Sequence, residues 1–458
     1  MALVALAIVG VLAMAALSID VGTLYQASAE AQRAADAAAL AAARVISLSG
    51  ITGDPSNSTS SWQPVCGGAS SSATLAAMNV AQQNLIGGNA ASTVTVYYGT
   101  SGGATSTTCI GASSDFGFNP VVKVYVQQAK LPTFFARVFS LIPSGTSSNS
   151  GVSATAAAEA FNPSGSGTPK SSAMIPVQPR CVKPWIVPNR DPGNAIAPHN
   201  FVSPTDGSIV NKGVFQLGGG VIGETFLLGA DCVPGAADCE VSTGHILNNP
   251  PQWISPGPPA YLQYVPALVQ GTPSAAPSCA NGNVYQEAIG GCDQTTVYTC
   301  GTSSATPGAT QADLTENPVN PAATTGDTST AAQCLIHQSA GGGEDIIDDA
   351  PGTFPFPIKA GDENLLVTNG LAKKDDVITA SNSVATLPIA DFSGGATLTG
   401  PQPAVTIVGF LQVFIKSVDT TTGNINVTVL NVAGCGNDAE NPAVNGTSPV
   451  PVRLITPP

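Results

Sequence analysis

The longest apolar run of the chain stands at its beginning. Residues 1–19 carry no charge and are almost wholly apolar, and Asp20 ends the run. A helix over this run would be roughly 28 Å long at about 1.5 Å per residue. That length is close to the hydrocarbon thickness of a bilayer. The pattern therefore predicts a transmembrane helix over residues 1–19.

An alanine-rich stretch follows and predicts that the same helix continues to about Ile46. Alanine is the best helix former, and Glu30, Arg33 and Asp36 stand three apart, where opposite charges can pair. Alanines three or four apart share one face of a helix. We expect that face to pack tightly, since small side chains let backbones approach closely. Its members are Ala27, Ala31, Ala34, Ala35, Ala38, Ala41 and Ala42.

The next segment mixes helix and strand patterns. Apolar residues at helical spacing predict a helix over residues 71–87 and a shorter one over 131–141. Strands are predicted by β-branched and aromatic content at 94–98 and 121–127, and a last strand at 152–161. We expect a long helix on a small antiparallel sheet, forming a pilin-like αβ domain over residues 20–162.

The second half of the chain has a different composition and pattern. Residues 163–172 are rich in Gly, Ser and Pro, which is typical of a linker. Residues 173–458 favour a β-rich extracytoplasmic domain, with a flexible insertion at about 302–332. The clearest pattern is a hairpin, in which strands at 406–418 and 425–432 flank a turn containing glycine. The predicted fold class is thus α+β.

Charge and cysteine content narrow the class of protein. The net charge is -14 with only 10% charged residues, which excludes a nucleic-acid binder that needs a basic surface. The 10 cysteines form no CxxC motif, so disulfides in an oxidising compartment are favoured over zinc. Their pairing stays open, with Cys232–Cys239 and Cys292–Cys300 as short-loop candidates. The cysteines are Cys66, Cys109, Cys181, Cys232, Cys239, Cys279, Cys292, Cys300, Cys334 and Cys435.

Candidate chemistry is sparse. Gly218, Gly220 and Gly223 satisfy GxGxxG, but the following residues are too turn-rich for the helix of a dinucleotide site. An acidic cluster could hold Ca²⁺, although it lacks the alternating pattern of an EF-hand loop, and a solvated loop is the competing interpretation. The cluster consists of Glu344, Asp345, Asp348 and Asp349. We find no GxSxG elbow. The prediction is a protein without catalytic residues or cofactor.

The N-terminal pattern resembles a known family. An apolar run, then DVGxLY, then an Ala-rich helix with ADAAALAAA is similar to the N-terminal segment of TadE/TadG-like Flp (Tad) pilus-assembly proteins. The combination is far more specific than either half. Its residues are Ala16, Asp20, Val21, Gly22, Leu24, Tyr25, Gln32, Arg33, Ala34, Ala35, Asp36, Ala37, Ala38, Ala39 and Leu40.

The resemblance implies a structural function. It implies a membrane-anchored, extracytoplasmic component of a Tad/Flp-type pilus, either a minor pilin or an assembly factor. Residues 1–19 would then lie in the inner membrane or in a filament core. Partners would be other pilus or envelope assembly proteins bound through the N-terminal helix. The alternatives are that the chain is itself a filament-forming pilin, or that it is a surface adhesin or binding module.

Overall fold

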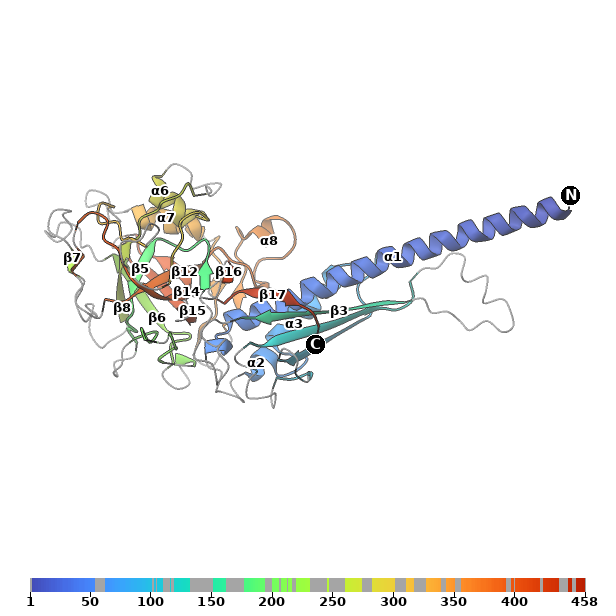
Figure 1. Ribbon diagram of the computed structural model, residues 1–458, viewed down its shortest axis with the longest axis horizontal. Coiled ribbons are helices and arrows are strands. Elements are labelled where there is room, and N and C mark those ends of the chain that lie inside the picture. Colours follow the sequence, from blue (N-terminus) through green and yellow to red (C-terminus); the bar gives the residue numbers. More distant parts are fainter. Residues whose placement is uncertain are drawn as a thin grey trace.

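A computed structural model gives the architecture of the protein (Figure 1). It describes residues 2–53, 62–100, 103, 105–109, 116, 119–131, 151–161, 177–193, 200–205, 207–211, 213–215, 220–230, 245–246, 260–273, 282–300, 310–316, 327–338, 343–350, 356–392, 397–398, 400–420, 423–435, 444–446 and 450–457. The fold is α+β, as predicted: a long N-terminal helix and a β-rich bulk with antiparallel sheets.

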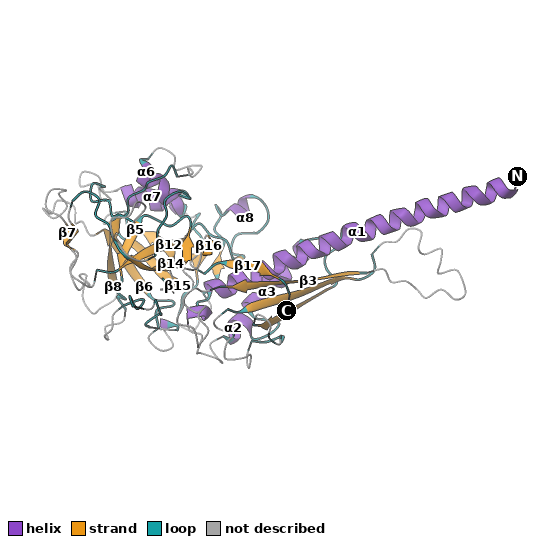
Figure 2. Ribbon diagram, in the orientation of Figure 1, coloured by secondary structure: helices purple, strands orange, loops and turns teal. Residues whose placement is uncertain are grey.

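One continuous helix, α1 (Ala2–Leu48), begins the chain. At about 1.5 Å per residue it is about 70 Å long, and its N-terminal part projects beyond the rest of the molecule (Figure 2). Gly50 ends it in the left-handed region, with φ +74°, a conformation that glycine adopts without steric cost. The prediction of one helix running from the apolar segment through the alanine-rich segment is confirmed.

A four-stranded antiparallel sheet packs against the second half of α1. Its order is β1-β2-β3-β17, and both α1 and α3 contact it. The strands β2 and β3 turn small or β-branched side chains toward α1, including Val122, Val124, Ala156 and Ala158. The elements of this part are α2 (Gln63–Cys66), α3 (Ser72–Gln83), β1 (Thr93–Gly99), β2 (Val121–Gln128), β3 (Val152–Ala160) and β17 (Val452–Ile455).

The fourth strand of this sheet comes from the other end of the chain. β17 pairs with β3 from Val452↔Ala160 to Ile455↔Ala157. Arg453 on β17 forms an ion pair with Glu159 directly opposite on β3. The composition of residues 173–458 predicted one β-rich domain that includes the C-terminal residues. The pairing instead makes them part of the helix-bearing sheet, so the barrel sequence lies between two strands of that sheet.

The second half contains a closed barrel with the strand order β12-β14-β15-β6-β8-β5. The predicted hairpin is its longest ladder, in which β14 and β15 pair from Gly409↔Gly434 to Val418↔Ile425. Two pairs are parallel, β6 with β8 and β5 with β12. The barrel strands are β5 (Trp185–Pro188), β6 (Thr225–Ala230), β8 (Ala260–Pro266), β12 (Val384–Ala390), β14 (Ile407–Val418) and β15 (Ile425–Gly434).

Short elements surround the barrel. The strands β9, β10 and β11 form one small sheet, β13 pairs with β7, and β16 pairs with β4. The bounds are η1 (Ile51–Gly53), β4 (Val177–Pro179), β7 (His245–Ile246), α6 (Val284–Gly290), α7 (Asp327–Leu335), β9 (Ile346–Ile347), β10 (Ile358–Lys359), α8 (Leu365–Thr368), β11 (Val377–Ile378), β13 (Thr397–Leu398) and β16 (Val444–Gly446).

Two sequence predictions fall largely outside the described residues. Of the helix predicted over 131–141, only Leu131 is described. Of the insertion predicted at about 302–332, residues 310–316 and 327–332 are described, and they pack against the barrel. Ala312, Leu314 and Ala332 are buried there.

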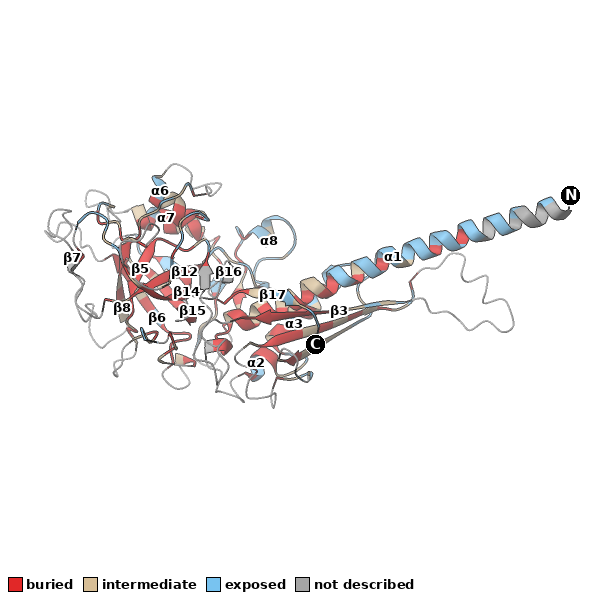
Figure 3. Ribbon diagram, in the orientation of Figure 1, coloured by how far each residue is buried: buried red, intermediate tan, exposed pale blue. Residues whose placement is uncertain are grey.

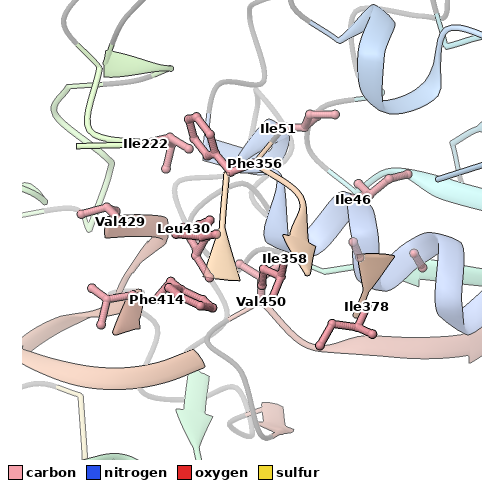
Figure 4. Packing of buried hydrophobic residues seen from close by; sticks show 14 of the residues in the cluster. Ile46, Ile51, Ile222, Phe356, Ile358, Ile378, Phe414, Val429, Leu430 and Val450 are labelled. Carbon is pink, nitrogen blue, oxygen red and sulfur yellow. The ribbon is translucent and has the colours of Figure 1, made fainter. Parts of the chain in front are cut away.

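The helix and the barrel share one apolar core. Ile46 and Ile51 at the end of α1 lie among Ile222, Phe356 and Leu430 from the barrel side (Figure 4). At the same place the buried Asn431 side chain of β15 donates a hydrogen bond of 2.6 Å to the carbonyl of Ser47. That carbonyl is one of the last in the helix and has no intrahelical partner. The bond therefore joins the end of α1 directly to the barrel.

Disulfides connect distant parts of the chain. Cys66 bonds to Cys109, Cys181 to Cys292, and Cys300 to Cys435. The short-loop prediction Cys292–Cys300 is wrong, because each of these cysteines is held by a partner more than 100 residues away. Cys334 is also disulfide-bonded. Cys232, Cys239 and Cys279 lie outside the described residues, and so does the predicted Cys232–Cys239 pair.

We expect peptide mapping without reduction to recover the Cys181–Cys292 and Cys300–Cys435 peptides. Replacing Cys300 and Cys435 together by serine should lower the free energy of unfolding by about 2–4 kcal/mol, because the crosslink restricts the unfolded chain. Denaturant melts of this variant and the parent measure the loss. A peptide that links Cys292 to Cys300 would contradict the assignment.

Candidate functional site

Most described residues in the part of α1 that projects beyond the sheet are exposed (Figure 3), and several of them are large and apolar. Large apolar residues normally lie inside a protein, and a contiguous exposed set marks an interaction surface. Eight described large apolar side chains of the projecting part are each at least 42% exposed, whereas Leu24 packs at the margin of the core. The set is Val4, Ile8, Val11, Met14, Leu17, Ile19, Val21 and Tyr25.

Within the residues that the structure describes, no helix combines the length and the apolar character needed to cross a membrane. The transmembrane assignment of residues 1–19 has no support from them.

Three of the exposed side chains form a stripe. Leu17, Val21 and Tyr25 are four residues apart, so they lie above one another on one side of the helix. Tyr25 is the most exposed, at 76%. Val21 and Tyr25 belong to the family motif, but the motif alone did not predict that they form an exposed surface with Leu17. The four-residue spacing alone could have indicated it.

Gly22 lies beside this stripe with open space around it. A Cβ added at Gly22 would meet no atom within 4 Å, so packing within the chain does not require glycine there. Glycine in a helix interior costs about 1 kcal/mol relative to alanine. Ser18, one turn earlier, is also small and exposed. Two small residues four apart let another helix approach closely.

The second half of α1 has the opposite character. Of the alanines predicted to form the packing face, all are buried except Ala41, which is of intermediate exposure. They pack with the alanines of β3 in one core. Both surfaces carry small side chains, so the helix backbone lies close to the sheet. Ala39 and Ala43 extend the buried face beyond the predicted set.

The other residues of the family motif also divide into a buried set and an exposed set. Asp20 is buried, with 2% of its surface exposed, and Leu24 and Leu40 pack at the margin of the core. Arg33 is exposed, whereas Asp36 and Ala37 are intermediate. The motif therefore combines residues that hold α1 on its own sheet with residues that face outward.

Two carboxylates of α1, those of Glu30 and Asp36, accept hydrogen bonds. Glu30 accepts hydrogen bonds from the Gly87 N–H at 2.7 Å and from Gln26 at 3.0 Å. The Gly87 bond, followed by the Gln26 bond, lowers the pKa of Glu30. Asp36 accepts a hydrogen bond from Gln32 at 2.8 Å. Glu30 thereby ties the helix to the turn after α3, a link that the predicted pairing with Arg33 did not anticipate.

The structure separates the acidic residues considered for Ca²⁺. Asp345 is buried and accepts from the Gly361 N–H and from Asn364, both at 2.8 Å. Asp349 pairs with Lys416 at 2.9 Å. Asp348 lies 3.9 Å from Lys359, and Glu344 has intermediate exposure. In the described part of the chain, no three His, Cys, Asp or Glu side chains gather as a metal site.

The glycine motif precedes a strand. Gly223 has φ +83° and is followed, one residue later, by β6. A dinucleotide site would need a helix there. This supports the interpretation of a glycine loop before a strand, and Gly218 lies outside the described residues.

Comparison with known proteins identifies the class of the N-terminal segment. Residues 1–45 match the family model described as "Putative Flp pilus-assembly TadE/G-like". The resemblance found in the sequence is confirmed over this segment, which is most of α1. The match supports a pilus-related role and a place in the envelope or at the cell surface. Neither the curated proteins nor the solved structures contain a match to this chain.

The buried alanine face yields a stability prediction. Ala35→Leu and Ala38→Leu replace fully buried alanines, and overfilling a close-packed contact costs about 1–3 kcal/mol. Ala29→Leu is the matched control, because Ala29 is exposed on the same helix and leucine is a good helix former. Thermal melts should show a loss of stability for the first two variants and none for the control. Equal melting of all three would contradict a packing role.

Proposed function

We propose that this chain is an extracytoplasmic structural component of a Tad/Flp-type pilus, acting as a minor pilin or an assembly factor. The observation that carries the proposal is the exposed apolar part of α1, which lies inside the segment matched to the pilus-assembly family. The N-terminal helix is the assembly element, and its partners are the helices of other pilus components.

The energetics favour a partner for this surface. Burying apolar area is worth roughly 25 cal/mol per Å², and the set from Val4 to Tyr25 leaves such area in water. The Leu17–Val21–Tyr25 stripe supplies the apolar contact. The adjoining Ser18 and Gly22 let a neighbouring helix approach closely. An acidic residue inside the interface is avoided, because Asp20 is turned into the chain's own structure.

The rest of the chain presents the barrel at the C-terminal end of α1. The second half of α1 is fixed on its sheet, and the barrel is joined to the end of that helix by the Ser47–Asn431 bond. The disulfides fit an oxidising compartment outside the cytoplasm. We therefore place the bulk of the chain in the bacterial envelope or on the cell surface, with the N-terminal helix held in the inner envelope or in a filament. We propose no enzymatic activity and no cofactor.

A filament-forming pilin subunit would use the same surface. The two roles differ in where the chain lies and in how much of it is present. Immunogold labelling along the whole length of surface filaments would favour the subunit, whereas sparse or basal labelling would favour a minor component. Labelled cells without filaments that still adhere through this chain would favour the adhesin alternative and count against the proposal.

The stripe should be required for assembly. Leu17→Lys and Val21→Lys each place a charge on it, and an unpaired buried charge is strongly unfavourable. We expect each variant to reduce co-purification with other pilus components and the number of surface filaments, with the thermal melt unchanged. Gln26→Lys is the control, since Gln26 is an exposed polar residue on the side of the same helix away from the stripe.

Two outcomes would contradict the proposal. One is full recovery of filaments and partners by the stripe variants. The other is a deletion of this chain that leaves pilus production unaltered in a cell that makes Tad pili.

A further inference from the structure

Two carboxylates are buried together at one end of the barrel. Asp191 follows β5 and is fully buried, and Glu224 immediately precedes β6 with 1% of its surface exposed. A Cβ built on Gly193 would stand only 2.5 Å from Oε1 of Glu224. The Glu224 carboxylate is therefore aimed at the turn formed by residues 191–193.

The two groups differ in their hydrogen bonding. Asp191 accepts from the Gly193 N–H at 3.2 Å and from Nδ2 of Asn211 at 2.7 Å. Neither oxygen of Glu224 has a partner with full hydrogen-bond geometry in the described part of the chain, although the Asp191 carboxylate and the Gly193 N–H lie beside it. Burial, and then the negative charge of Asp191, raise the pKa of Glu224 well above its ordinary value. A buried carboxylate without donors is unfavourable, so another group is expected to satisfy it.

We propose that Asp191 and Glu224 form a Ca²⁺ site beneath the Gly193 turn. Ca²⁺ takes 6–8 oxygen ligands, accepts carboxylates in one- or two-oxygen mode and tolerates irregular geometry. A cation satisfies both orphan oxygens of Glu224 at once, whereas a shared proton satisfies one. Asn211 and the Gly193 N–H hold Asp191 in place, as outer hydrogen bonds do for metal-ligating carboxylates. These residues are separate from the acidic cluster at 344–349.

The site adjoins the junction between helix and barrel. Ile222, two residues before Glu224, packs in the core shared with Ile51 (Figure 4). A Cβ on Gly50 would lie 2.5 Å from the Ile222 side chain, so the end of α1 rests against this turn. Binding a cation at Glu224 therefore fixes the segment that receives the helix, and it stabilises the junction as well as the barrel.

The test uses the full chain, stripped with EDTA and then titrated with CaCl₂ or MgCl₂. Calorimetry should show one Ca²⁺ bound at this site, and the melting temperature should rise with Ca²⁺ and much less with Mg²⁺. Glu224→Gln and Asp191→Asn should lose the Ca²⁺ response. Asp345→Asn is the matched control, because Asp345 is a buried carboxylate whose two oxygens are already hydrogen-bonded. It should lower the melting temperature and keep the Ca²⁺ response.

Gly193→Ala provides a second variant in which no carboxylate is removed. Its Cβ displaces Oε1 of Glu224, so the affinity for Ca²⁺ should fall at least tenfold. A parent chain that shows neither heat nor a melting shift with Ca²⁺ overturns the site and assigns a shared proton to the two carboxylates. A Ca²⁺ response of equal size in the parent and in Glu224→Gln also overturns it, since the ion then binds elsewhere.

Discussion

The burial of the end of α1 against the barrel is the contact on which the arrangement depends. Ile46 and Ile51 enter the barrel-side core, and Asn431 completes the hydrogen bonding of the Ser47 carbonyl. A helix end buried without such a partner would leave polar groups unsatisfied. The bond and the apolar contacts occupy the same few residues, so the direction of the helix relative to the barrel is fixed where the helix ends.

This fixed end explains the division of α1 into two surfaces. Ala34, Ala35 and Ala38 are buried on the sheet, and Ala16 and Asp20 are buried in the preceding turns, so only the other side of those turns faces outward. The exposed stripe of Leu17, Val21 and Tyr25 follows directly from this geometry. A single segment, matched as a whole to one pilus-assembly family, therefore carries both an intramolecular and an outward-facing surface.

Local patterns in the sequence predicted the elements whose formation depends on neighbouring residues. Alanine content predicted α1, and alternating β-branched residues around Gly423 predicted the β14–β15 hairpin. Contacts between distant residues were beyond such patterns. The pairing of β17 with β3 and the Cys300–Cys435 bond join segments more than 100 residues apart, and very short strands such as β9 carry too few residues for a period. The Asp191–Glu224 pair could not be predicted from the sequence for the same reason, because the fold alone brings the two carboxylates together.

The position of β17 has a mechanical consequence. The barrel sequence leaves the sheet after β3 and returns to it at β17, and these strands are neighbours held by Val452↔Ala160, by the Phe161 N–H bonded to the Pro451 carbonyl, and by the Arg453–Glu159 ion pair. Tension applied to the barrel is divided between two adjacent strands and the end of α1. A load directed along these strands shears the hydrogen bonds between β2 and β3 together instead of opening them one by one. The barrel is thus held through two neighbouring strands and the end of the helix. A single flexible linker could not divide a load in this way.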